Sequence, residues 1–72
     1  MEAGTRILIN DKWGRTLKGT VIGEDGNAWL LETRPFNPPD TDVRTLYPKS
    51  AEAPTIITEE EFNKTPWVKN NW

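Results

Sequence analysis

The chain has 72 residues, which is enough for one domain and too few for two. It contains no cysteine and no histidine, so disulfides, thiolate nucleophiles and nearly all transition-metal sites are excluded. Its formal net charge is −2, whereas a non-specific nucleic-acid binder is normally basic. We therefore expect no metal and no other cofactor, and the charge disfavours nucleic acid as a partner.

The sequence shows no segment that would place the chain in a membrane. Its longest uncharged apolar run is Ala-Trp-Leu-Leu at residues 28–31, which is far too short to cross a bilayer. The first residues lack the basic and then apolar pattern of a secretory signal. We expect a cytoplasmic protein with no membrane partner.

Five segments have the composition of β-strands. They are short runs rich in β-branched and aromatic residues, bounded by glycine, proline or polar residues, at residues 5–9, 17–22, 28–34, 43–47 and 55–57. Residues 10–16 read as a polar loop that carries Trp13. The proline-rich residues 35–40 read as a second loop, because proline lacks the N–H that a strand ladder uses. This arrangement predicts a small all-β barrel or sandwich.

A short helix is predicted directly after Thr58. Thr58 and Glu61 have the spacing of a capping box, and Ile57 and Phe62 occupy the positions of a hydrophobic staple. The proline at position 66 ends the helix. A tail with two tryptophans follows.

Four stretches carry a resemblance to a known superfamily. They are Gly-Thr-Arg-Ile at 4–7, Gly-Thr-Val-Ile-Gly at 19–23, Gly-Asn-Ala-Trp at 26–29, and Val43 with Leu-Tyr-Pro at 46–48. They resemble the framework of Src-homology-3-like small β-barrels, and their spacing is similar to that of the plasmid-borne type II dihydrofolate reductases. In those reductases a Val-Gln-Ile-Tyr stretch lines the pore. The corresponding residues 43–47 are Val-Arg-Thr-Leu-Tyr, without the glutamine, so the activity is not carried over.

The resemblance implies an all-β fold. We expect a five-stranded Src-homology-3-like barrel over residues 1–58. One short helical turn and an aromatic tail, residues 59–72, are expected to pack on that barrel as part of a single domain.

Asp25 and Gly26 are predicted to form the two-residue turn of a central hairpin, since both tolerate positive φ. Glu24 would then pair with Asn27, and both sides of the hairpin would be largely apolar. One side would carry Thr20, Ile22, Trp29 and Leu31, and the other Val21, Ala28 and Leu30. A small barrel has one interior, so the second side needs a cover. Three covers are considered: the C-terminus of the chain, a second copy, or a foreign protein.

The candidate contacts for a protein partner are large apolar side chains, the type that dominates interface energies. They are Trp13, Trp29, Leu31, Phe36, Tyr47, Trp67 and Trp72. Trp13 and Phe36 have a second interpretation, in which they close the open end of the barrel. No nucleophile–base pairing accompanies the carboxylates, so we expect no enzyme. The favoured interpretation is a non-catalytic protein-binding module, an accessory or inhibitory factor of phage-like type that occupies a partner's surface.

Two alternatives are kept open. The first is a barrel that binds single-stranded nucleic acid through cations on the predicted strands, namely Arg6, Lys18, Arg34 and Arg44. The second is an enzyme like the type II dihydrofolate reductases, with its site at the centre of a homo-oligomer.

Overall fold

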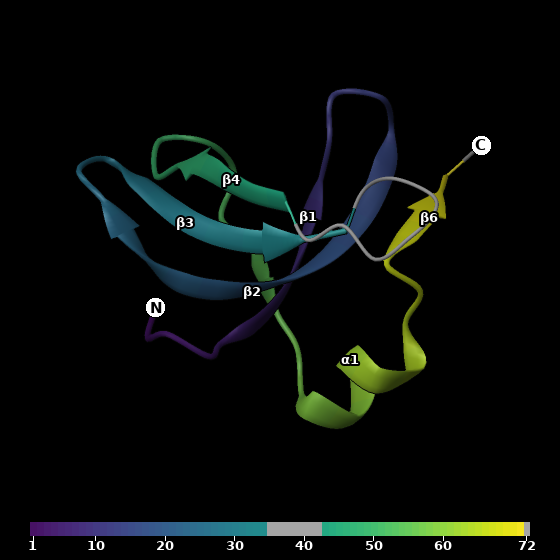
Figure 1. Cartoon of the computed structure of the whole chain (residues 1–72). Helices are drawn as coiled ribbons and strands as arrows, with labels where there is room; N and C mark the ends of the chain where they lie inside the picture. The colour runs from purple at the N-terminus through teal and green to yellow at the C-terminus, as the bar shows by residue number, and fades with distance from the viewer. Residues whose placement is uncertain (35–42, 72) are drawn as a thin grey trace.

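The fold is one antiparallel β-sheet with one short helix (Figure 1). The computed structural model describes residues 1–34 and 43–71. Its elements follow the chain in the order β1 (Arg6–Asn10), β2 (Arg15–Asp25), β3 (Ala28–Thr33), β4 (Val43–Pro48), β5 (Thr55–Ile56), α1 (Glu59–Lys64) and β6 (Val68–Asn70). Each of the five predicted strands is present, and the predicted helix follows Thr58 directly. The predicted proline-rich loop with Phe36, and Trp72 at the end of the tail, lie outside the described residues.

The sheet is open. Strands β4, β3, β2, β1 and β5 are neighbours in that order, and β6 pairs with β2. The predicted five-stranded barrel is therefore wrong in strand number and in closure, because six strands form a sheet in which no ladder joins β4 to β5 within the described residues. Strand β5 has only two residues, both paired with β1. Prolines at positions 48 and 54 remove N–H groups at both ends of the β4–β5 connection, which further disfavours closure.

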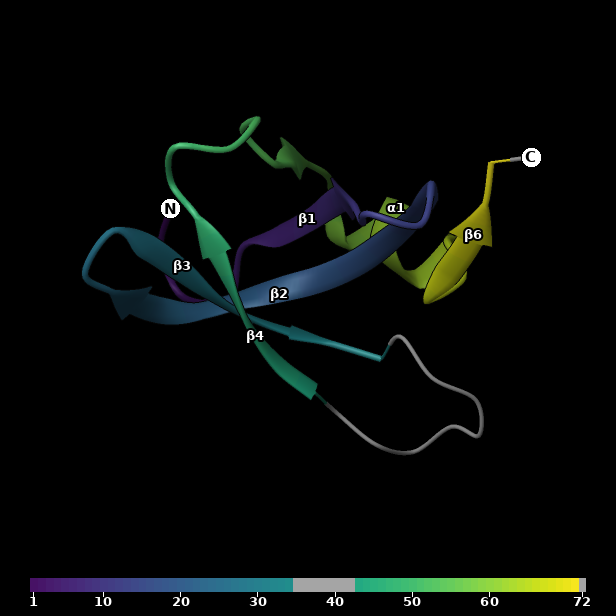
Figure 2. The ribbon, with the colours of Figure 1, turned by 90° about the horizontal axis from the view of Figure 1, so that it is seen from above.

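The sixth strand lies in the predicted tail. Strand β6 pairs with the start of β2, where Leu17 lies opposite Val68. Strand β2 has 11 residues, so it pairs with β3 along its second half and still offers its first residues to β6 (Figure 2). Three residues give no readable periodicity, so the sequence pattern alone did not indicate this strand.

The hairpin of β2 and β3 turns one residue later than predicted. Asp25 pairs with Ala28, so Gly26 and Asn27 form the turn. Of these two residues only Gly26 has positive φ, at 60°. The observed turn places positive φ on glycine, which adopts it more readily than the aspartate at position 25, where the predicted turn would have needed it.

A β-bulge at Ile22 changes which side chains face each other across this hairpin. Val21 lies opposite Leu31, and both are fully buried. The predicted register, with Thr20 opposite Leu31 and Val21 opposite Leu30, is therefore wrong. The bulge places two branched apolar side chains together in the core, and their burial favours this register.

The core lies on one side of the sheet, here called the core face. Its buried side chains come from alternate positions of β1, β2 and β3, and they are Ile7, Ile9, Leu17, Val21 and Leu31. Trp29 and Tyr47 are partly buried against this cluster. They lie opposite each other at the end of the β3–β4 ladder, where the core face reaches solvent.

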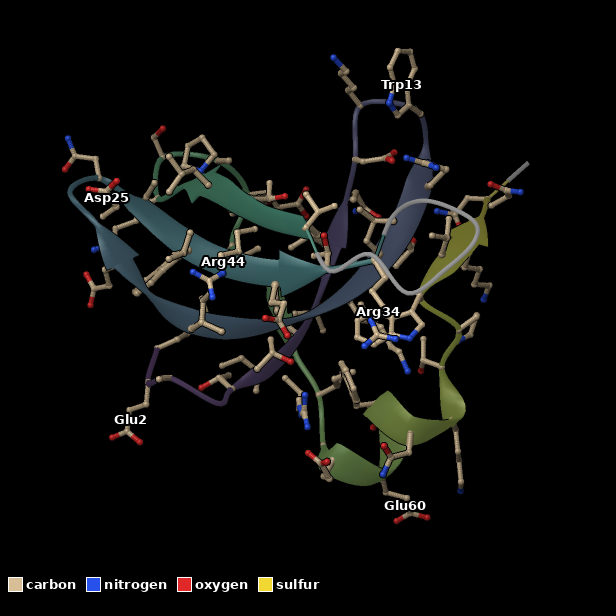
Figure 3. All side chains as sticks on the ribbon, in the orientation of Figure 1. Glu2, Trp13, Asp25, Arg34, Arg44 and Glu60 are labelled. Carbon is tan, nitrogen blue, oxygen red and sulfur yellow. The ribbon has the colours of Figure 1, made fainter. Side chains whose placement is uncertain are left out.

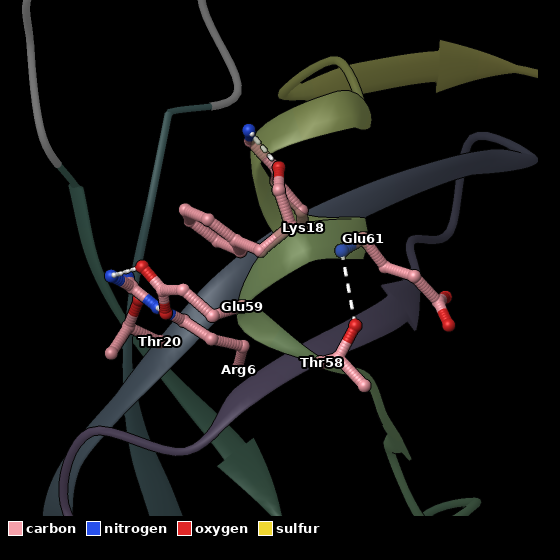
Figure 4. Close-up of polar contacts among 7 residues, drawn as sticks. Arg6, Lys18, Thr20, Thr58, Glu59 and Glu61 are labelled. Atoms are coloured by element: carbon pink, nitrogen blue, oxygen red, sulfur yellow. Dashed lines mark hydrogen bonds and ion pairs between the residues drawn. The ribbon is translucent and has the colours of Figure 1, made fainter.

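The other side, here called the helix face, is partly covered by α1 and the residues that lead into β6 (Figure 1). Thr58 caps the helix, and its Oγ1 accepts a 3.1 Å hydrogen bond from the backbone N–H of Glu61 (Figure 4). Ile57 and Phe62, the two residues of the predicted staple, are both buried. A helix of six residues is not stable in isolation, so its contacts with the sheet keep it folded.

Candidate functional site

An apolar groove opens at the edge of the core face, beside the unclosed seam between β4 and β5. It is here called the Trp29 groove, and its volume is about 300 Å³. The lining residues are Met1, Trp29, Pro48, Lys49, Ala51, Ala53, Pro54 and Ile56. The N-terminal residue and the connection from β4 to β5 therefore line the same groove.

Trp29 lines this groove, and a lysine lies over its ring. The Lys49 ammonium lies 4.4 Å from the centroid of the Trp29 ring and also pairs with the Glu24 carboxylate. The hydrogen bond from Lys49 lowers the pKa of Glu24. The Tyr47 hydroxyl donates a 2.5 Å hydrogen bond to the Glu52 carbonyl, which fixes the connection that forms one wall. The groove is thus built from side chains with defined positions.

Ile56 is the most exposed large apolar side chain of the groove, at 64%. It lies on β5 opposite Ile7, which is fully buried. Two other lining residues, Met1 and Trp29, pack against the core cluster, so the groove adjoins the core. The sequence assigned residue 56 to a strand, but nothing in it indicated that this strand would stand beside Trp29.

The predicted partner-contact residues do not form one surface. Trp29 lines the groove and Tyr47 lies beside it. Leu31 is fully buried and supports the sheet from within the core. Trp67 packs against the helix. Trp13 lies at the tip of the β1–β2 hairpin with 62% of its surface exposed, and the Lys12 ammonium lies 4.9 Å from its ring centroid (Figure 3).

The loop that carries Trp13 is ordered by Asp11. One carboxylate oxygen accepts hydrogen bonds from the backbone N–H groups of Trp13 and Arg15, both at 2.9 Å. The other accepts a 2.6 Å bond from Nε of Arg15. Trp13 thus stands on a defined turn, about which the sequence indicated only a polar loop.

Three of the four predicted nucleic-acid cations converge on the helix face. The Arg6 guanidinium lies 4.1 Å from the Phe62 ring centroid, and the Lys18 ammonium lies 4.2 Å from that centroid and 4.7 Å from the Trp67 centroid. Arg34 lies 5.0 Å from the Trp67 centroid, between the sheet and α1 (Figure 3). Each of these cations therefore packs against an aromatic ring of the C-terminal segment.

The fourth cation, Arg44, lies on β4 and is exposed. The register places it in one row across four strands, on the helix face, with Arg6, Thr20 and Glu32. Arg6 donates a 2.6 Å hydrogen bond to the hydroxyl of Thr20 (Figure 4). The helix face therefore carries all four predicted cations, although only three of them meet.

Glu59 was missed as a partner of this group. Its carboxylate accepts hydrogen bonds from Nε of Arg6 at 2.8 Å and from Nη2 at 3.1 Å. In the sequence, the position of Glu59 in the first turn of a helix was a sufficient reason for an acidic residue. Its contact with Arg6 spans 53 residues, so no local pattern indicates it. The hydrogen bond to Glu59 raises the pKa of Arg6, and the same bond lowers the pKa of Glu59.

Within residues 1–34 and 43–71, no group of three or more acidic side chains is placed to hold a metal ion. No helix in the same ranges combines the length and apolar character needed to cross a membrane. Comparisons of the chain with protein-family models, with curated proteins and with solved structures found no match.

Proposed function

We propose that this protein is a non-catalytic protein-binding module that contacts its partner through the Trp29 groove. One observation carries the proposal: an apolar groove with a highly exposed isoleucine adjoins the core at the unclosed seam of the sheet. Apolar surface left in water costs about 25 cal/mol per Å². A partner that fills the groove would remove this cost.

The partner we propose supplies an extended segment with an apolar side chain. Strand β4 is paired on one side only within the described residues, so its other edge offers backbone groups to an added strand. A segment lying along the seam would pair with this edge and place a side chain beside Ile56. Strand addition of this kind combines main-chain hydrogen bonds with a side-chain pocket for specificity.

The charges near the groove favour a segment with basic flanks. Glu2 follows Met1, Glu52 lies between two lining alanines, and both are exposed. The Lys49 charge is already matched by Glu24. A basic residue beside the apolar anchor would meet these carboxylates and would accelerate association.

The test compares Ile56→Glu with Trp13→Glu. Both residues are large, apolar and more than half exposed, and both variants add one negative charge, but Trp13 lies on neither the groove nor β4. Each purified variant is used as bait for the proteins that bind the wild type, with circular dichroism to confirm folding. We expect Ile56→Glu to lose the bound protein and Trp13→Glu to retain it. Equal retention by both variants would contradict the proposal.

We also propose that the chain is related to Src-homology-3-like domains. The support is architectural. The first four strands are consecutive antiparallel neighbours, and β5 returns to lie beside β1.

A further inference from the structure

The helix face holds a buried cation, Lys18, close to two further cations, Arg6 and Arg34. Lys18 is only 6% exposed, although it carries a charge on a long side chain. Its pKa is lowered, first by burial and then by the positive charges of Arg6 and Arg34. Its ammonium donates a 2.6 Å hydrogen bond to the backbone carbonyl of Phe62, so the buried charge is held by a group of the C-terminal segment.

The groups that the C-terminal segment brings to these cations are an aromatic ring and an anion. Phe62 and Trp67 meet edge to face, with centroids 5.4 Å apart, and Lys18 lies against both rings. The Glu59 carboxylate binds the Arg6 guanidinium through two hydrogen bonds, the geometry with which arginine also binds phosphate. A nucleotide offers the same pair of groups, a stacking ring and a phosphate oxygen.

We propose that the helix face is a binding site for a phosphate attached to an aromatic base, as in single-stranded nucleic acid, and that α1 and Trp67 occupy this site in the free protein. The phosphate takes the place of the Glu59 carboxylate on Arg6. A base takes the place of the Phe62 and Trp67 rings beside Lys18 and Arg34. Arg44, in the same cross-strand row as Arg6, extends the site beyond the covered part.

The covering segment is suited to displacement. Helix α1 has six residues, and strand β6 adds three pairs to the sheet. The Arg6–Glu59 ion pair is largely exposed on the glutamate side, at 63%, so solvent weakens it. The overall charge of −2 does not argue against the site, because three of the acidic residues belong to the first turn of the covering helix.

The test uses the full chain and a matched pair of variants, Glu59→Gln and Glu61→Gln. Both variants remove one negative charge from the same exposed helical turn, but of the two residues only Glu59 contacts Arg6. Binding of a short fluorescein-labelled oligothymidylate is followed by anisotropy over a range of salt concentrations. We expect Glu59→Gln to bind at least about twofold more tightly than Glu61→Gln, since the competing ion pair is weak. Equal affinities, or no binding by either variant, would overturn the proposal.

Two further measurements locate the bound oligonucleotide. Hydrogen exchange should show faster exchange of the amides of Phe62 and Thr65 when oligonucleotide is added, because α1 must leave the sheet and a helix of six residues does not persist alone. Binding without this change would overturn the proposal. Adding Arg44→Gln to the Glu59→Gln variant should reduce the slope of log affinity against log salt by about 0.7, the value for one phosphate contact on a single strand. An unchanged slope would show that Arg44 makes no phosphate contact and would contradict the proposal that Arg44 extends the site.

The source of the phosphate is distinguished by competition. Thymidine monophosphate that competes as strongly as the unlabelled oligonucleotide would support the site and assign it to free nucleotides. Competition by the oligonucleotide alone would support it as a site for single-stranded nucleic acid.

Discussion

The ammonium of Lys18, on β2, donates a 2.6 Å hydrogen bond to the backbone carbonyl of Phe62, in α1. The same ammonium lies against the Phe62 ring. Lys18 therefore contacts both the backbone and the side chain of Phe62, which follows it by 44 positions. This contact joins the C-terminal segment to the sheet. It also places a buried charge beneath the helix.

Trp67→Ala should release the C-terminal segment. The substitution removes the ring that contacts Phe62, Lys18 and Arg34, and we expect a loss of about 2–3 kcal/mol in the free energy of unfolding. Urea unfolding measures the loss. Trp13→Ala is the control because Trp13 is exposed, and it should change stability by no more than about 0.5 kcal/mol. Equal effects of the two substitutions would show that Trp67 does not hold the segment.

Gly19→Ala should destabilise the sheet for a steric reason. A Cβ at this position would lie 2.9 Å from Cγ2 of Thr33 and 3.0 Å from the carbonyl oxygen of Glu32. Relieving this contact requires a shift of backbone, and we expect a loss of about 1–3 kcal/mol.

Gly23→Ala is the matched control for Gly19→Ala on the same strand. No atom lies within 4 Å of a Cβ built at Gly23. Its effect should be neutral or stabilising by up to about 1 kcal/mol, because alanine has less conformational freedom in the unfolded chain. Thermal unfolding of both variants tests the difference. A larger loss for Gly23→Ala would show that the packing around β2 differs from this description.

Thr33→Val should raise stability. Thr33 is 1% exposed, and within the described residues its hydroxyl has no hydrogen-bond partner. Valine has the same shape without the buried polar group, so we expect a gain of up to about 1 kcal/mol. Thr20→Val should act in the opposite direction, because the Thr20 hydroxyl accepts the hydrogen bond from Arg6. The midpoint of denaturant unfolding should therefore rise above that of the wild type for Thr33→Val and fall below it for Thr20→Val. A lower midpoint for Thr33→Val would contradict a buried Thr33 hydroxyl without a hydrogen-bond partner.

Asp11 should make the loop around Trp13 sensitive to acid. Burial alone would raise the pKa of Asp11, but hydrogen bonds from Arg15 and Trp13 outweigh this effect and lower the pKa below its ordinary value. The folded protein therefore binds a proton at Asp11 less readily than the unfolded chain does. The stabilisation is present above the unfolded pKa, near 4, and is lost as pH falls through the folded pKa.

Two substitutions of Asp11 separate its charge from its hydrogen bonds. Asp11→Ala removes both and should cost about 1–2 kcal/mol at neutral pH. Asp11→Asn retains an acceptor for the two backbone N–H groups, so the loss should be smaller. The acid-dependent part of the stability assigned to Asp11 should vanish in both variants. Unfolding curves measured from neutral pH to below pH 4 test this, and an unchanged pH dependence in Asp11→Asn would contradict it.

Local signals in the sequence determined the elements of this protein. The runs of β-branched residues placed five strands, and the Thr58–Glu61 capping box placed the helix, because each depends on residues close together in the chain. The same local rules placed the turn one residue too early. A bulge decided which side of β2 faces the core, and the bulge depends on the fit of Val21 to Leu31.

Only the tertiary structure decided what these elements do together. The contacts of Arg6 with Glu59 and of Lys18 with Phe62 join residues 53 and 44 positions apart. The Trp29 groove is lined by both the first residue of the chain and the β4–β5 connection. The sequence named the cations and the aromatic residues but not their partners, because such contacts are selected by the packing of the whole chain and not by neighbours along it. For the same physical reason composition alone could not show whether the sheet closes, since closure depends on whether two short edge strands meet.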